Sequence, residues 1–514
     1  MSRVNQQLFD PFGQEECEKE VLVMKDGYEE IFFEEAPFNE PAISENAYLI
    51  IGRRGSGKTA LAHFFTFQKS IPNSRCVDVN EPEVYREVIK HLAQYPNSEP
   101  REFIIPHLVG VWEAVVWLTI VEYLRAELDS VADVLRAQQR QSKLSLNSVF
   151  ERIKDLIVPP DHRATEANLA RLNEEGRLDH AKAAIFSTSA DRPLIIAIDT
   201  LEQYDVSNDS MMNAIAALVE FAATFHAKYA HRGLHIKVFV SGEVFPFLEE
   251  GVLLNPLKSA KHPVHLLWRP KDLLRLISWR LFKRLQKNGL LLPESVPIRR
   301  WDDSKEVFER MWVPYFGRWV TNLRGEKETT FSYMLRHTQM RPRQLIVLCN
   351  SVANLALQEE TFPRLHEDHL REGVKTAEKR LSTEIINAYS SVYTNAGKIA
   401  EALSGCENIF PARELDKRAK ETATHWPPHQ YSLYNFRRFV VELGIIGRVK
   451  RRNDESGYVD ADFEYSSEGR LSLSTQDECV IHPMFYHRLN ITVKDGTKVM
   501  PFSSDRSVSE REGI

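Results

Sequence analysis

The sequence is poor in cysteine, and the few cysteines it has are widely spaced. They are Cys17, Cys76, Cys349, Cys406 and Cys479, in a chain of 514 residues. A zinc site or a disulfide framework needs cysteines at close or paired spacing, such as C-x-x-C, and this sequence has none. We therefore expect neither kind of site. The pattern fits a reducing compartment, and we expect a cytoplasmic protein.

The sequence also lacks an excess of positive charge and a long uncharged apolar run. It has 66 Lys and Arg against 72 Asp and Glu, a net charge of -6. Any contact with nucleic acid must therefore come from a local basic patch. The most apolar stretch, residues 108–124, contains Glu113 and Glu122, and the first residues lack the apolar segment of a signal peptide. We expect a buried helix there and no contact with a membrane.

Hydrophobic residues make up 43% of the chain, enough for several packed domains at this length. In the first half of the chain, short apolar or alternating segments are separated by helical patterns. This alternation is typical of a parallel sheet flanked by helices, because apolar strands need cover on both faces. The expected strands are residues 47–52, 76–80, 194–199, 236–241 and 263–267.

The strand pattern stops near residue 268, and helical patterns follow. Residues 209–229, with a capping signal at Asp209 and Ser210, and residues 271–285 are expected helices. We divide the chain into an N-terminal extension (1–40), an α/β core (41–268) with a helical insertion around 82–190, a helical region (269–390), a small α+β domain (391–495) and a flexible tail (496–514).

The segment "GRRGSGKT" carries the clearest chemical signal. It follows the apolar run "AYLII", precedes a helical pattern and fits G-x-x-x-x-G-K-[ST]. In this phosphate-binding loop the backbone amides surround phosphate oxygens, Lys58 reaches the β- and γ-phosphates, and Thr59 ligates Mg²⁺. The sequence has no N/T-K-x-D guanine reader, so we expect ATP. The expected nucleotide-binding residues are Gly52, Gly55, Ser56, Gly57, Lys58, Thr59 and Ala60.

A carboxylate must share the magnesium ion with Thr59. Asp199 ends the apolar run "LIIAID", and its side chain is expected at the carboxyl edge of the sheet beside the loop. Many related ATPases have a glutamate directly after this aspartate to polarise the attacking water. Here the next residue is Thr200, and Glu202 is the nearest candidate, either as the catalytic carboxylate or as a solvent-facing acid.

Four features together resemble the AAA+ and STAND groups of P-loop ATPases, in particular those similar to the origin recognition complex. They are "IDTLEQY" around Asp199, "KVFVSGE" with Ser241, "HTQMRPRQLIVL" with Arg343 or Arg341, and the segment from "HWPPHQYSLYNF" to "ECVIHPMF". The resemblance implies a P-loop NTPase core with Mg²⁺-dependent, slow ATP hydrolysis. It also implies a sensor at Ser241, a helical lid whose Arg343 reaches the nucleotide, and a C-terminal winged helix.

Residues 242–263 contain no arginine, where ring-forming AAA+ ATPases have an arginine that acts on the neighbouring subunit. Lys258 or Lys261 could substitute, but an ammonium lacks the planar fork of a guanidinium. We therefore favour a switch over a ring motor, while a homo-oligomer remains open.

Basic residues cluster in the expected winged helix. If Leu433, Phe436, Val440 and Leu443 face its core, the helix presents cations on its other side. Clustered cations on a helix and an adjoining hairpin are what contact with duplex DNA requires, although protein contacts are an equally open interpretation. The expected nucleic-acid-binding residues are Arg437, Arg438, Arg448, Lys450, Arg451 and Arg452.

Three functions compete at this stage. The first is an ATP-hydrolysing switch whose nucleotide state controls engagement of a separate protein partner, with anti-phage defence in bacteria as the setting that the resemblance suggests. The second is a DNA-binding ATPase that resembles replication initiators. The third is a scaffold that binds ATP without turnover.

Overall fold

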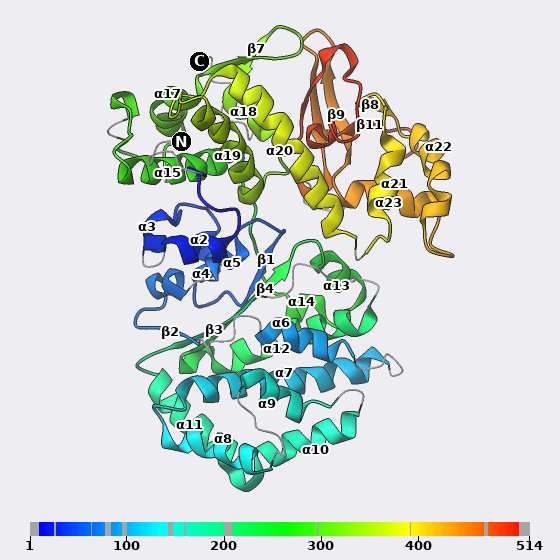
Figure 1. Cartoon of the computed structure of the whole chain (residues 1–514). Coiled ribbons are helices and arrows are strands. Elements are labelled where there is room, and N and C mark those ends of the chain that lie inside the picture. The colour runs from blue at the N-terminus through cyan, green and yellow to red at the C-terminus, as the bar shows by residue number, and fades with distance from the viewer. Residues whose placement is uncertain are drawn as a thin grey trace. The chain divides into compact units, whose positions relative to one another are not determined.

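The structure is a computed structural model that describes residues 10–24, 27–62, 64–77, 84–94, 100–141, 148–158, 161–199, 208–295, 298–390, 392–466 and 471–502. The chain divides into two compact units, which we describe separately (Figure 1). The core unit is Pro37–Leu267. The C-terminal unit is Trp268–Ile514 together with Met1–Ala36, so the segment that precedes the core unit in sequence packs with the segment that follows it.

The core unit is built on a five-stranded sheet in the order β2-β3-β4-β1-β5, and every pairing is parallel. This confirms the expected parallel sheet with flanking helices. Part of the second expected strand, residues 78–80, lies outside the described residues. Because β4 lies between β1 and β3, the carboxyl ends of these three strands adjoin at one edge of the sheet. The strands are β1 Leu49–Gly52, β2 Arg75–Cys76, β3 Leu194–Asp199, β4 Leu234–Ser241 and β5 Val264–His265.

Two long apolar helices, α12 (Asp209–Tyr229) and α7 (Arg101–Leu124), stack on one face of this sheet. The indole of Trp112 in α7 donates a hydrogen bond of 2.9 Å to the carbonyl of Ala214 in α12. Among the described residues α7 is the one helix long and apolar enough to cross a membrane, yet 72% of its apolar window is buried in the protein. The expectation of a buried helix at residues 108–124 agrees with this packing.

The capping prediction for α12 was wrong by one residue. The side chain of Asn208, not Asp209 or Ser210, accepts the hydrogen bond from the backbone N–H of Met211, at 3.0 Å. Asparagine and aspartate cap equally well, so composition alone cannot choose between neighbouring positions.

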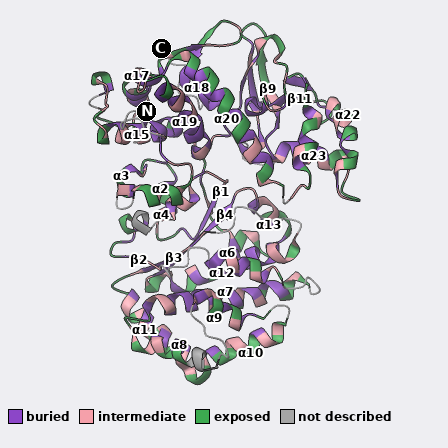
Figure 2. Cartoon of the chain, in the orientation of Figure 1, coloured by how far each residue is buried: buried purple, intermediate pink, exposed green. Residues whose placement is uncertain are grey.

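The segment between β2 and β3 is entirely helical where it is described. Its helix α6 (Val84–Leu92) packs against β3 and α12, whereas the later helices form layers that extend away from the sheet. The outermost of these helices alternate buried and exposed faces (Figure 2). Besides α7, the helices of this segment are α6 Val84–Leu92, α8 Asp129–Gln141, α9 Val149–Leu156, α10 His162–Leu172, η3 Glu174–Gly176 and α11 Arg177–Ser189.

The opposite face of the sheet is covered by shorter elements. Side chains alternate along β4, so Ile236 and Val238 face the α12 side while Lys237 faces the other. The Lys237 ammonium is fully buried and donates to the carbonyls of Ala42, Ser44 and Ala47, with 2.6 Å to the last of these. The elements on this face are α4 Asn39–Ile43, α5 Lys58–Leu61 and η2 Phe64–Lys69; η4 Ala230–Arg232, α13 Phe245–Gly251 and α14 Pro256–Ser259 complete the unit.

The C-terminal unit begins with helices, as the sequence predicts, interrupted by a short β-hairpin. Asn350 in α19 binds the N-terminal segment on both sides: it accepts from Phe12 N at 3.0 Å and donates to Gly13 O at 2.9 Å. The elements are α2 Cys17–Met24, α3 Tyr28–Ile31, α15 Pro270–Lys287, η5 Pro293–Ser295, α16 Ser304–Val307, η6 Phe308–Trp312, α17 Val313–Phe316, β6 Trp319–Thr321, β7 Lys327–Thr329, α18 Thr330–Leu335, α19 Pro342–Gln358 and α20 Glu367–Ala388.

The rest of the C-terminal unit is a mixed five-stranded sheet, β12-β10-β9-β11-β8, with helices. Its last strand falls within the expected flexible tail: Val499 and Met500 are buried in β12, so the chain stays ordered beyond residue 496. Residues 503–514 lie outside the described residues. The elements are α21 Ala396–Ala400, η7 Glu401–Leu403, β8 Ile409–Pro411, α22 Arg413–Glu421, η8 Ala423–His425, α23 Leu433–Glu442, β9 Ile446–Asn453, β10 Tyr458–Asp462, η9 Glu464–Ser466, β11 Glu478–Ile481, η10 Pro483–Phe485, η11 Lys494–Gly496 and β12 Lys498–Met500.

Candidate functional site

The loop between β1 and α5 has the backbone that its glycines predict. Gly55 and Gly57 have φ of 77° and 102°, which favour glycine. Gly52 is required for a different reason, because a Cβ there would lie 2.4 Å from Ser56 Oγ and 3.0 Å from Lys58 Cγ. The loop therefore turns tightly between strand and helix. Of the other expected nucleotide-binding residues, Ser56 is buried in the loop and Ala60 lies in α5.

Lys58 is held inside the loop. Its side chain is 3% exposed, and the ammonium donates to the carbonyls of Gly52 at 2.9 Å and Arg53 at 3.3 Å. Within the part of the chain that the structure describes, Lys58 has no carboxylate partner. A buried ammonium whose charge is not neutralised favours an anion beside it.

Thr59 and Asp199 lie together, although 140 residues separate them in the sequence. The Thr59 hydroxyl donates a hydrogen bond of 2.8 Å to Asp199 Oδ2. Arg86 of α6 approaches the same oxygen, at 3.5 Å. Arg86 could not be predicted from the sequence, since it lies in an ordinary amphipathic helix with no motif around it.

Ser241, at the end of β4, is fully buried, and its hydroxyl donates to Glu243 Oε2 at 2.6 Å. The Glu243 carboxylate also accepts from the backbone N–H of Arg54 in the loop, at 3.0 and 3.2 Å. Glu243 is the second residue near the loop that the sequence analysis missed. Its position two residues beyond a predicted strand end was the signal that could have found it.

The described part of the core unit includes neither of the two remaining expected site residues. Glu202 lies outside the described residues. Arg343 belongs to the C-terminal unit, where its side chain donates to the carbonyl of Glu15 at 3.2 Å and pairs with Glu384 at 3.6 Å.

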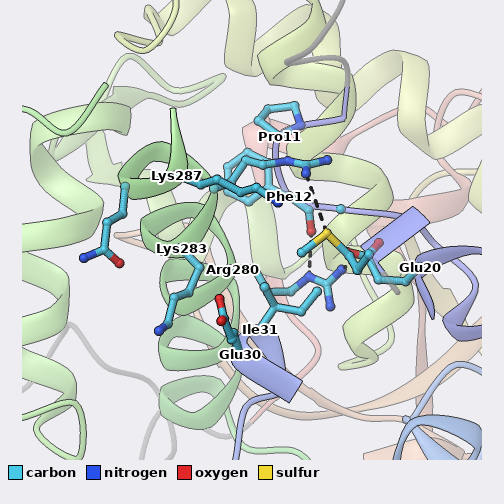
Figure 3. A pocket seen from close by; sticks show the side chains of 12 residues that line it. Pro11, Phe12, Glu20, Glu30, Ile31, Arg280, Lys283 and Lys287 are labelled. Atoms are coloured by element: carbon cyan, nitrogen blue, oxygen red, sulfur yellow. Dashed lines mark hydrogen bonds and ion pairs between the residues drawn. The ribbon is translucent and has the colours of Figure 1, made fainter. Parts of the chain in front are cut away.

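A pocket of about 310 Å³ lies within the C-terminal unit, between the N-terminal segment and α15 (Figure 3). Phe12 and Met24 contribute apolar walls, and Arg280, Lys283 and Arg284 contribute cations. Arg280 is tied down, since its Nε donates to Phe12 O at 2.6 Å. None of the residues expected to bind nucleotide, metal or nucleic acid lines this pocket.

The six cations expected to bind nucleic acid lie on α23 and β9. Five of them are paired with carboxylates, and Arg451 alone makes no ion pair among the described residues. The pairs are Arg437 with Asp416 at 3.0 Å, Arg438 with Glu442 at 2.5 Å, Arg448 and Lys450 with Asp462 at 3.8 and 3.6 Å, and Arg452 with Asp454 and Glu478 at 2.5 and 3.1 Å.

The expected core face of α23 needs one correction. Phe436, Val440 and Leu443 are buried, but Leu433 is 40% exposed, and its neighbour Tyr434 is 70% exposed. Leu433 is the first residue of the helix, after the Ser432 cap, where the helical face has not yet met the domain core.

Comparison with protein families gives a match to part of the chain. Residues 300–388 match the family described as the FunZ-associated C-terminal helical domain. The matched segment ends with α20, belongs to the C-terminal unit and does not include the loop of the core unit. No curated protein matches the chain.

Proposed function

We propose that the core unit binds ATP with Mg²⁺ at the loop Gly52–Thr59 and hydrolyses it slowly. We further propose that its nucleotide state controls engagement of a separate protein partner. The observation that carries the ATP site is the hydrogen bond between Thr59 and Asp199. Thr59 and Asp199 were expected from the sequence to share a magnesium ion, and the Thr59 hydroxyl lies 2.8 Å from Asp199 Oδ2.

The environment of Lys58 supports an anionic ligand. The loop turns through two left-handed glycines, so its successive amides can surround an anion, and α5 begins at Lys58 itself. The buried ammonium adds a positive charge that carbonyls solvate but do not neutralise. A triphosphate would supply the missing negative charge.

The residues present also fit Mg²⁺. This ion prefers oxygen ligands and is usually held by one or two carboxylates together with substrate phosphates, rather than by a cage of protein side chains. Thr59 and Asp199 supply a hydroxyl and a carboxylate, and the ion bound there would neutralise phosphate charge. In the described part of the chain no group of three or more His, Cys, Asp and Glu forms a metal cage. Arg86, at 3.5 Å from Asp199 Oδ2, would help to orient that carboxylate.

Slow turnover follows from the residues beside the loop. The hydroxyl of Ser241, the expected sensor, is already donated to Glu243. It must exchange this partner before it can donate a hydrogen bond to a phosphate or to a water molecule. A site that needs such a rearrangement suits a switch better than a motor.

Equilibrium binding of ATP to the full chain tests this proposal, with and without Mg²⁺. We expect one saturable site that weakens when Mg²⁺ is removed, and loss of binding in Lys58→Met. Asp199→Asn should lose the Mg²⁺ dependence while the fold is retained. Equal ATP binding by the wild type and Lys58→Met would refute the proposal.

The alternative, a DNA-binding ATPase that uses a winged helix, rests on the basic residues of α23 and β9. Against it stands the pairing of five of the six cations with carboxylates, because paired cations must give up these partners to bind phosphate. Titration of labelled duplex DNA at several salt concentrations separates the two. The switch predicts no binding beyond the non-specific range, Kd of about 10⁻⁴–10⁻⁶ M at physiological salt. Tighter, strongly salt-dependent binding that Arg451→Ala and Arg452→Ala weaken would favour the alternative.

A further inference from the structure

Glu243 is a carboxylate placed against the loop that is proposed to bind phosphate. Its Oε1 accepts the backbone N–H of Arg54 at 3.0 Å, and Oε2 accepts the Ser241 hydroxyl at 2.6 Å. Ser241 and the loop are held in register as well, since Gly242 N donates to Gly52 O at 3.0 Å. The carboxylate is therefore fixed from both β1 and β4 and is not a mobile surface acid.

The Glu243 carboxylate contacts the loop close to its first left-handed residue. Arg54 directly precedes Gly55, the first left-handed residue of the loop. Consecutive Cα atoms are 3.8 Å apart, so the carboxylate lies within about 7 Å of the Gly55 amide. The backbone before Glu243 also runs close to the loop: a Cβ at Gly242 would lie 3.1 Å from Arg53 Cγ and 3.2 Å from Arg53 N. The segment carrying Glu243 thus runs in contact with the loop.

An acid at this place opposes the ligand that the rest of the site attracts. The Gly55 amide is one of the groups proposed to bind phosphate, so a phosphate bound there would lie near the Glu243 carboxylate. Two negative charges about 7 Å apart in a partly buried site repel each other by an amount that changes affinity about tenfold or more. The α- and β-phosphates of ADP and ATP are common to both nucleotides, while the terminal phosphate of ATP adds negative charge. The fixed carboxylate therefore repels ATP more strongly than it repels ADP.

We propose that Glu243 is a specificity-determining residue that weakens ATP relative to ADP until its carboxylate leaves the Arg54 amide. The inference rests on the proposed ATP site. Release of Glu243 frees the Ser241 hydroxyl in the same movement, because one carboxylate holds both groups. It also moves the residue that lies two positions before α13 (Phe245–Gly251), so the terminal phosphate is linked to the start of that helix.

The test is the ratio of ATP to ADP affinity, measured with the full chain and Mg²⁺ by titration calorimetry. Glu243→Gln keeps an oxygen for the Arg54 amide and removes the charge. We expect it to tighten ATP binding roughly tenfold and ADP binding less than threefold. Glu243→Ala should shift the ratio in the same direction, and it serves if the Gln variant is unstable. Glu249→Gln, an exposed acid of α13, is the matched control and should leave the ratio unchanged.

The outcomes separate this inference from the proposed function. If the wild type binds neither nucleotide, both fail. If it binds them and Lys58→Met abolishes binding, but the Glu243 variants leave the ratio within twofold of the wild type or weaken ATP selectively, the ATP site stands and the role of Glu243 is refuted. A structural role alone would change the unfolding temperature and leave the ratio unmoved.

Discussion

Replacement of Lys58 by methionine separates what the lysine does for the fold from what it does for the ligand. In the protein without nucleotide, the variant loses two hydrogen bonds from a charged donor to the carbonyls of Gly52 and Arg53. Each is worth about 1.5–3 kcal/mol. The variant also removes an ammonium that is 3% exposed and has no carboxylate partner among the described residues. The desolvation of such a charge costs several kcal/mol.

These two contributions have opposite signs and similar size. We therefore expect the free energy of unfolding of the nucleotide-free core unit to change little, by about 1 kcal/mol in either direction. The large effect appears with ligand. Mg·ATP at 100 times its Kd should stabilise the wild type by about 2.7 kcal/mol. For a unit of this size that shift raises the unfolding temperature by about 5–10 °C.

Differential scanning calorimetry with and without Mg·ATP measures both the stability of the nucleotide-free protein and the shift in unfolding temperature that the ligand causes. Lys58→Met should unfold near the wild-type temperature without nucleotide and show no shift with it. Lys90→Met, an exposed lysine of α6, is the control and should keep the full shift. A variant that retains the ATP-induced shift would refute the assignment of Lys58. A variant that is several kcal/mol less stable without ligand would instead give the lysine a structural role.

Two predictions concern stability. Burial lowers the pKa of Lys237 from 10.5 to about 7. The folded state then binds fewer protons than the unfolded state between these values, so the free energy of unfolding should rise with pH from about 7 to 10.5, by at most ~5 kcal/mol. Urea titrations across this range should show the rise in the wild type and its loss in Lys237→Met; equal slopes would contradict the burial argument. In the C-terminal unit, Glu378 is 1% exposed; its Oε1 lies 2.5 Å from His337 Nδ1, and its Oε2 is hydrogen-bonded to His487. Glu378→Gln should therefore cost about 3–5 kcal/mol, and a loss below 1 kcal/mol in urea unfolding would show that the ion pairs contribute little.

The local parts of this architecture were predictable from sequence. An apolar run followed by "GRRGSGKT" specifies strand, turn and helix within a dozen residues. The neighbouring positions of Thr59 and Asp199 follow from a general property, since parallel strands end at one edge of a sheet. The parallel sheet with flanking helices could be predicted from the alternation of apolar segments and helical patterns.

What could not be predicted depends on contacts between distant segments. Arg86 contacts Asp199 from a helix with no motif. Glu243, just after β4, contacts Arg54, just after the neighbouring strand β1. Likewise, part of the pairing of the basic cluster of α23 and β9 comes from acids far away in the sequence: Asp416 precedes Arg437 by 21 residues. A sequence pattern shows which residues are neighbours along the chain. Whether a basic side chain is neutralised depends on which acidic side chains the fold places beside it.

The most direct test of the central claim is calorimetric titration of the purified full chain with ATP in the presence of Mg²⁺, beside Asp199→Asn. The account predicts one saturable site per chain in the wild type. In the variant it predicts binding that is weaker and no longer responds to Mg²⁺. Absence of saturable binding in the wild type, or identical Mg²⁺-dependent binding by both proteins, would contradict the account.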